Sequence, residues 1–154
     1  MGEKHYKDDA TLDIDAMMIE MYESKEKTAS ACPSPDAFLE AYRGAENVIA
    51  ITITGGLSGS QNSAQLAKKM LLEEAPETNI EVFDSLSASG EMVLFVQKAN
   101  ELIAQGLSFE EVVAALKEYL ASTKLLFALA RVDNLVKNGR LNKLVGAVIG
   151  MLNI

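Results

Sequence analysis

Apolar positions along the chain repeat with two different spacings, and these spacings divide it into helices and strands. Residues 14–22 place apolar side chains three and four positions apart, which predicts a helix that opens near Leu12 and Asp13. The short run of residues 48–53 is apolar on both faces, as in a parallel strand covered by helices, and residues 80–83 (IEVF) predict the next strand. Residues 58–75 between them predict a helix. This strand–helix–strand order is typical of a parallel α/β sheet.

The rest of the chain continues the alternation of helices and strands. Further helices are predicted over residues 35–44, 88–105, 108–122, 132–137 and 141–152. Ser108 and Glu111 have the spacing of a capping box. Residues 125–130 are a candidate third strand. We therefore expect one α/β domain over residues 1–154, with a mainly parallel sheet flanked by helices.

Composition narrows the range of partners. The net charge of −8 and the sequence pI near 4.7 argue against nucleic acid and anionic membrane surfaces as partners. Cys32 is the single cysteine and cannot form an intramolecular disulfide, so a cytoplasmic location is expected. No apolar run reaches the roughly 18 residues of a membrane helix, so membrane insertion is not expected.

Residues for catalysis are scarce. His5 is the single histidine and lies in the polar first ten residues, which argues against a zinc site or a Ser-His-Asp triad. The turn after the first predicted strand lacks the lysine of a phosphate-binding loop and does not match GxGxxG. We therefore expect no enzymatic activity, no metal and no cofactor.

The stretch ITITGGLSGS, residues 51–60, is the first candidate binding site. Ligands of open α/β sheets bind at the carboxyl ends of strands, and a helix N-terminus suits a carboxylate or phosphate. Thr54, Gly55, Ser58 and Ser60 could supply hydroxyl and backbone donors there. Alternatively, Ser58 only caps the helix and the glycines only shape the turn. The sequence leaves both interpretations open.

For Ser30, Arg140 and Asp84 the sequence allows both a functional role and a purely structural one. Ser30 lies in a loop rich in small polar residues, which is also the composition of an ordinary turn. Arg140 carries the planar fork that pairs with carboxylates, and it is equally compatible with an exposed turn after Gly139. Asp84 could orient a loop or, as the sequence favours, cap the following helix.

Taken together, four stretches resemble the DegV family of fatty-acid-binding proteins. They are KTASACPSPDAF (27–38), ITITGGLSGSQNSAQLA (51–67), VFDSLSASGE (82–91) and LVKNGRLNKLVGAVIGMLNI (135–154). The second stretch is the most specific, because family members carry Leu-Ser-Gly-Thr with a downstream Ser-Ala. The resemblance implies a two-domain α/β protein that buries a long acyl chain, such as palmitate, and holds its carboxylate with hydroxyls.

The resemblance also implies roles for individual residues. Ser30 and Ser58 stand where the family's carboxylate-binding hydroxyls lie, and Thr54, Gly55 and Ser60 are weaker candidates. Arg140 resembles an arginine near the tunnel mouth, with a role in partner contact. Some members present the acyl group to a separate fatty acid kinase.

The sequence departs from the family pattern at both ends and in one motif. The family's first strand, which ends in Asp-Ser, and its second domain are absent from these 154 residues. The family's Thr-Ser-x-Pro reads Ser30-Ala31-Cys32-Pro33, so one hydroxyl is lost. The alternative hypothesis is therefore an α/β fragment that binds no ligand and forms homo-oligomers through exposed apolar surface.

Overall fold

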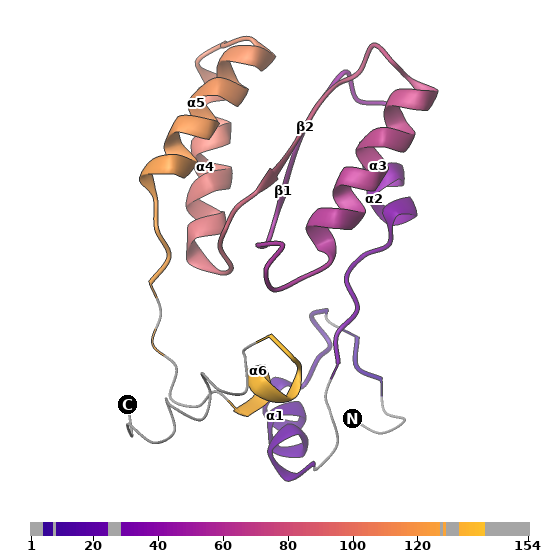
Figure 1. Ribbon diagram of the computed structural model, residues 1–154, viewed down its shortest axis with the longest axis vertical. Coiled ribbons are helices and arrows are strands. Elements are labelled where there is room, and N and C mark those ends of the chain that lie inside the picture. The colour runs from indigo at the N-terminus through magenta and orange to yellow at the C-terminus, as the bar shows by residue number, and fades with distance from the viewer. Residues whose placement is uncertain (1–4, 8, 25–28, 127, 129–132, 141–154) are drawn as a thin grey trace. The chain divides into compact units, whose positions relative to one another are not determined.

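The computed structural model describes residues 5–7, 9–24, 29–126, 128 and 133–140 (Figure 1). The chain divides into two compact units. The larger unit is Cys32–Phe127, and the smaller unit combines Met1–Ala31 with Ala128–Ile154.

A parallel pair of strands forms the centre of the larger unit. Strand β1 (Asn47–Thr52) pairs with β2 (Asn79–Asp84), in a register that sets Ala50 opposite Val82. Helix α3 (Ser60–Glu74) connects them as the crossover, which confirms the predicted strand–helix–strand unit. The predicted third strand is not found in the described part of its range, because residues 125, 126 and 128 have no strand conformation. The others of residues 125–130 lie outside the described residues.

Helices cover both faces of this sheet (Figure 1). Helix α2 (Pro35–Tyr42) and α3 pack on one face, over a core of Leu39, Tyr42, Ala64, Ala67, Leu71, Ile80 and Val82. Helices α4 (Gly90–Ala104) and α5 (Phe109–Ser122) pack on the other, over Phe83, Phe95, Ala99, Leu102, Val112 and Leu116. Adjacent residues of β2 enter opposite cores, as the pleat of a strand requires. The prediction of a parallel α/β fold flanked by helices is therefore confirmed.

Local sequence explains where most of these helices begin. Ser34 accepts a hydrogen bond from the N–H of Ala37 at the start of α2. The predicted capping box of α5 is present: the N–H of Glu111 donates to Ser108 Oγ at 3.3 Å, and the N–H of Ser108 donates to Glu111 Oε2 at 2.8 Å. Helix α4 begins two residues later than predicted, because Ser89 has a φ of +83° that interrupts helical geometry.

Glu81 ties helices from both faces to β2. Its carboxylate accepts from Lys68 Nζ of α3 and Lys117 Nζ of α5, at 2.9 Å each. Burial raises the pKa of Glu81, but the two lysine hydrogen bonds outweigh burial, so its pKa lies below the ordinary 4.5. This ion triad lies along the strand, away from the turns that follow it.

The smaller unit contains two described helices, α1 (Ile14–Glu23) and α6 (Asp133–Lys137). Asp13 caps α1 by accepting from the N–H of Ala16 at 3.0 Å, as the predicted helix start requires. No residue of α1 is buried, although its apolar side chains repeat at helical spacing. The predicted helix over residues 141–152 lies outside the described residues. None of the helices in the described residues combines the length and the apolar character of a membrane span.

Candidate functional site

The turn between β1 and α3 is organised around Thr54. Its backbone oxygen accepts from the N–H groups of Leu57 and Ser58, at 3.0 and 3.2 Å. Its hydroxyl accepts from the N–H of Gly56 at 3.3 Å, and its own N–H donates to the backbone oxygen of Ser87 at 2.7 Å. The polar groups of Thr54 therefore hold the turn together.

Gly55 contacts the loop that follows β2. Its N–H donates to Asp84 Oδ2 at 3.1 Å, so this backbone donor already has an anionic acceptor. A Cβ at Gly55 would lie 3.2 Å from the same oxygen, so a larger residue would fit here only if the Asp84 side chain shifted. Asp84 Oδ1 also accepts from the N–H of Leu86 at 2.9 Å. Asp84 thus orients two loops, and the prediction that it caps the next helix is wrong.

Two hydroxyls lie at the entrance to α3. Ser58 Oγ and Ser60 Oγ are 2.9 Å apart, and Ser58 Oγ also accepts from the N–H of Ser60 at 3.2 Å. The helix begins at Ser60, and Gly59 occupies its N-cap position without a side-chain hydrogen bond. Ser58 therefore lies one residue before the N-cap, so it is not the N-cap residue that the alternative interpretation of the sequence proposed. Both hydroxyls are only half-buried.

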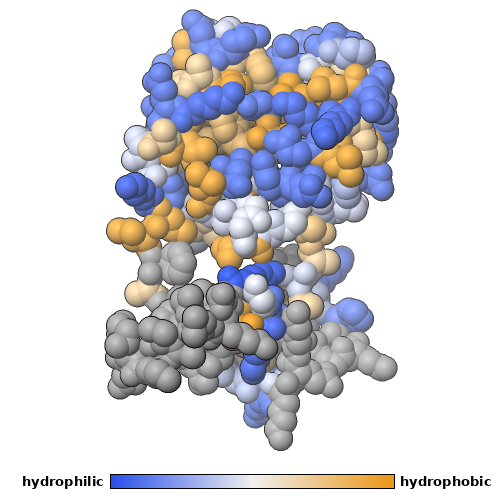
Figure 2. Space-filling view, in the orientation of Figure 1, coloured by the Kyte–Doolittle hydropathy of each residue, from blue (hydrophilic) through white to orange (hydrophobic). Residues whose placement is uncertain are grey.

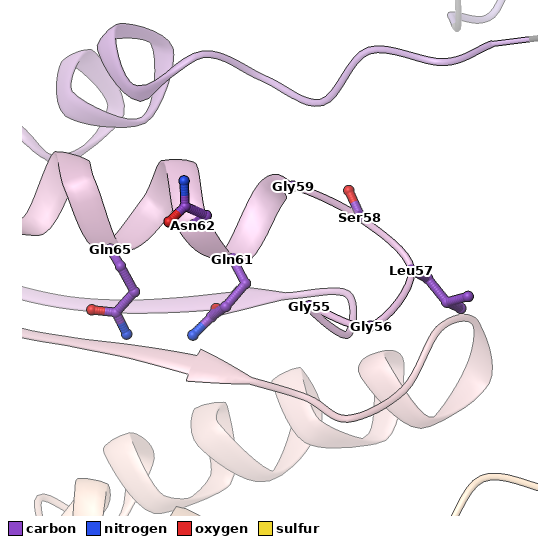
Figure 3. A pocket seen from close by; sticks show the side chains of 8 residues that line it. All are labelled: Gly55, Gly56, Leu57, Ser58, Gly59, Gln61, Asn62 and Gln65. Atoms are coloured by element: carbon purple, nitrogen blue, oxygen red, sulfur yellow. The ribbon is translucent and has the colours of Figure 1, made fainter. Parts of the chain in front are cut away.

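Backbone donors beside these hydroxyls remain open to a ligand. No described residue accepts from the N–H groups of Gly59, Gln61 or Asn62, which belong to the first turn of α3. The partial positive charge of a helix N-terminus acts at the same place. A hollow of about 510 Å³ is lined by Gly55, Gly56, Leu57, Ser58, Gly59, Gln61, Asn62 and Gln65 (Figure 3).

Two side chains of the hollow are held against the sheet. Gln61 Oε1 accepts from Thr52 Oγ1 at 2.6 Å, and Gln65 Nε2 donates to the backbone oxygen of Val82 at 3.3 Å. Figure 3 shows both glutamines directed toward the strands, while Ser58 and Asn62 point to the opposite side. The open donors of the turn therefore belong to Ser58, Asn62 and the backbone.

The segment that leads into α2 passes the N-terminus of α3. Cys32 Sγ lies 3.9 Å from Ser63 Oγ, and a Cβ at Gly59 would lie 3.0 Å from the same sulfur. The close approach depends on the absence of a side chain at Gly59. Cys32 is exposed and unbridged.

Ser30 and Arg140 belong to the smaller unit and contact each other. Arg140 Nη2 donates to Ser30 Oγ at 3.3 Å, although 110 positions separate the two residues in the sequence. Both side chains are exposed. The sequence predicted each of them as a site residue on separate grounds, and the structure brings them together within this unit.

Sequence reasoning missed the donors of Gln61 and Asn62. Their backbone N–H groups are candidate donors because of where they lie, since the second and third residues of any helix have no intrahelical acceptor. The available signal was the glycine-rich turn itself, which places the helix start at the carboxyl end of β1. Fold and site together define an α/β protein with a strand-to-helix turn that can accept an anion.

Comparison with known proteins assigns the family. The family model described as an uncharacterised protein of the DegV family matches residues 1–154, and the chain belongs to the DegV family. It is 61% identical over its whole length to a DegV domain-containing protein of Streptococcus pneumoniae. The chain spans about half the length of such relatives, 55% in that case. The resemblance read from the sequence is confirmed.

Two solved structures of relatives contain fatty acids. The fatty acid kinase B3 protein of Streptococcus pneumoniae, loaded with linoleic acid, is 61% identical, with a TM-score of 0.91 over 99% of this chain and 54% of that one. A DegV family protein of Eubacterium eligens, loaded with heptadecanoic acid, is 35% identical, with a TM-score of 0.88 over 96% of this chain and 53% of that one.

Proposed function

We propose that this protein binds a long-chain fatty acid, such as palmitate, with the carboxylate at the N-terminus of α3. The observation that carries this proposal is the group of donors at the carboxyl end of β1. Ser58 and Ser60 present hydroxyls, and Gln61 and Asn62 present backbone N–H groups without a described acceptor. Neutral donors and a helix dipole suit a single negative charge at the end of an apolar ligand.

Ser30 is the second proposed contact of the carboxylate. The support for this contact is the family motif, because Ser30 stands where family members carry a carboxylate-binding hydroxyl. Arg140 donates to Ser30 Oγ and carries the positive charge that would attract an anionic head group or an acidic partner surface.

The acyl tail accounts for most of the expected affinity. Each buried methylene contributes about 0.8 kcal/mol, so a sixteen-carbon chain contributes on the order of 10 kcal/mol before ordering costs. A bound carboxylate must be paired or hydrogen-bonded, which the turn provides. This division of roles favours a lipid over a nucleotide, because the turn lacks a phosphate-binding lysine.

For the full-length protein we propose an acyl-presenting role without catalysis of its own. The bound acid would be phosphorylated by a separate fatty acid kinase in the cytoplasm. Support comes from the relatedness to the fatty acid kinase B3 protein of Streptococcus pneumoniae. A phosphoryl-transfer assay on this chain alone is expected to show no turnover, and turnover would contradict the non-enzymatic role.

Ligand extraction tests the proposal directly. The purified 154-residue chain should release a long-chain fatty acid on solvent extraction, and native mass spectrometry should detect the complex. After delipidation, palmitate should rebind and hexadecane should not match it. Ser108→Ala is a suitable control, because it removes the N-cap of α5 without touching the turn. A chain that carries no lipid and ignores added palmitate would contradict the proposal.

The alternative of an oligomerising protein without ligand has one observation in its favour. Several apolar side chains of α4 are exposed, namely Val93, Leu94, Val96 and Ile103. Hydrophobic side chains also reach the surface of the larger unit among hydrophilic ones in Figure 2. Light scattering on the delipidated chain distinguishes the two: concentration-dependent assembly without palmitate binding would favour the alternative.

A further inference from the structure

We propose that Asp84 is the positioning residue of the head-group turn, residues 54–59 between β1 and α3. Its carboxylate holds the turn before α3 and the loop before α4 at a fixed distance, and thereby sets where the donors of α3 point. This inference rests on the proposed fatty-acid function and assigns to it a residue that does not touch the ligand.

The first support is the bridging geometry. Asp84 is the last residue of β2, and its two oxygens accept from different loops: Oδ2 from the N–H of Gly55 at 3.1 Å, Oδ1 from the N–H of Leu86 at 2.9 Å. Hydrogen bonds to an ionised carboxylate are stronger than those between neutral groups. One side chain at a strand end thus determines the separation of two neighbouring turns.

The second support is the backbone of the two loops. Leu86 has a φ of +53°, a left-handed conformation that a non-glycine residue adopts only where its surroundings hold it. The N–H of Thr54 donates to the backbone oxygen of Ser87 at 2.7 Å, which is a second bond between the same loops. Asp84 is half-buried beneath them.

The third support is the assignment of donors. Because Asp84 occupies the N–H of Gly55, that group is not offered to a ligand. The donors that remain belong to Ser58 and the first turn of α3. Without the carboxylate, Gly55 would gain a free N–H and the turn would lose its link to β2. A fatty acid head group would then meet a different and less ordered set of donors.

The sign of the effect separates positioning from simple electrostatics. Removal of a negative charge near an anion site raises the affinity for an anion if charge alone matters. Loss of positioning lowers it. Asp84→Asn keeps the size of the side chain and one acceptor oxygen, but its amide nitrogen cannot accept from an N–H group.

The experiment measures palmitate and hexadecanol binding to the delipidated chain, wild type and D84N, by displacement of a fluorescent fatty acid. The alcohol shares the tail and lacks the charge. D84N should lower palmitate affinity about tenfold, the effect of losing one hydrogen bond to a charged group. Hexadecanol affinity should change less than about twofold, because its binding depends on the tail. The ratio of the two affinities therefore reports on the head-group turn, whereas general destabilisation would weaken both ligands alike.

Glu81→Gln is the matched control. Glu81 is a half-buried carboxylate of the same strand, but its partners are Lys68 and Lys117 rather than loop N–H groups. E81Q should leave the palmitate-to-hexadecanol ratio unchanged. In an NMR spectrum, the amide proton of Gly55 should shift upfield in D84N and stay in place in E81Q.

The outcomes distinguish the fatty-acid function from the positioning role of Asp84. A wild-type chain that binds no palmitate overturns the fatty-acid function and the positioning role together. Wild-type binding with an unchanged ratio in D84N, or an increased palmitate affinity, overturns the positioning role alone. An unchanged Gly55 amide shift in D84N also contradicts it, and this measurement needs no ligand.

Discussion

The two turns at the carboxyl edge of the sheet use serine in opposite ways. Before α3, Ser58 and Ser60 are half-buried, and Ser58 lines a hollow. Before α4, Ser85 and Ser87 are 1% exposed, and their side-chain hydroxyls donate to backbone oxygens of the same loop. Ser85 Oγ donates to the backbone oxygen of Ser87, and the N–H of Ser87 donates back to Ser85 Oγ, at 3.2 Å each. The turn before α3 has hydrogen-bond donors that a ligand can reach, whereas the serine hydroxyls of the turn before α4 are already bonded within the protein.

This difference teaches that composition does not identify a binding turn. Both turns follow a parallel strand, both contain more than one serine, and both precede a helix of 15 residues. What separates them is whether the polar groups are satisfied within the protein. The satisfied turn makes a rigid support, through Asp84 and the oxygen of Ser87, for the one that remains open.

The largest expected effect is on binding by the open turn. Ser58→Ala should weaken palmitate binding by about 2 kcal/mol, roughly thirtyfold in Kd, because it removes a hydrogen bond to a charged group. The melting temperature should stay close to that of wild type, since Ser58 is half-buried and makes local bonds only. Calorimetric titration measures the first quantity and a thermal melt the second. Unchanged affinity would remove Ser58 from the site.

Ser85→Ala tests the closed turn and should have the reverse pattern. The free energy of unfolding should fall by about 1.5 kcal/mol, because the buried N–H of Ser87 loses its acceptor. Palmitate affinity of the folded protein should change little. Urea denaturation followed by circular dichroism gives the stability change. If Ser85→Ala instead weakened binding as much as Ser58→Ala, the contrast between the turns would fail.

Gly55→Ala should have a smaller effect that depends on Asp84. The new Cβ would lie 3.2 Å from Asp84 Oδ2, so the loops must separate slightly, and we expect about 1 kcal/mol of lost affinity or stability. Gly56→Ala is the matched control, because its Cβ would meet Thr54 Oγ1 at 3.6 Å, an ordinary contact. Equal effects of the two substitutions would show that the Asp84 contact does not limit the turn.

The smallest effect concerns the strand beneath both turns. The folded-state pKa of Glu81 is below its ordinary 4.5, so its contribution to stability is present above that pH and is lost as the pH falls through the folded-state pKa. Glu81→Gln should therefore lower the free energy of unfolding at pH 7. It should also make the free energy of unfolding of the variant fall less than that of the wild type as the pH is lowered. Glu118→Gln, at an exposed position of α5, is the control. Denaturant titrations at pH 7 and in acid compare the variants, and parallel curves for E81Q and wild type would contradict this role.

Much of the fold was predictable because its signals are local. The apolar runs of β1 and β2, Pro35 at the start of α2 and the capping box at Ser108 each encode structure within a few residues. The third strand was predicted from an apolar run alone, and a strand requires a partner that no local pattern specifies. The helix α1 was predicted from its apolar spacing, but none of its residues is buried among the described residues, because periodicity marks an apolar face and does not specify what packs against it.

The sequence by itself determined the α/β pattern, the family and the turn in which hydroxyls precede a helix, because these depend on neighbouring residues. The tertiary structure decided which donors of that turn are free, that Asp84 takes the N–H of Gly55, and that Arg140 meets Ser30 across 110 positions. Hydrogen-bond partners distant in sequence are chosen when strands and helices pack. The same serines could otherwise have been caps, supports or ligand donors.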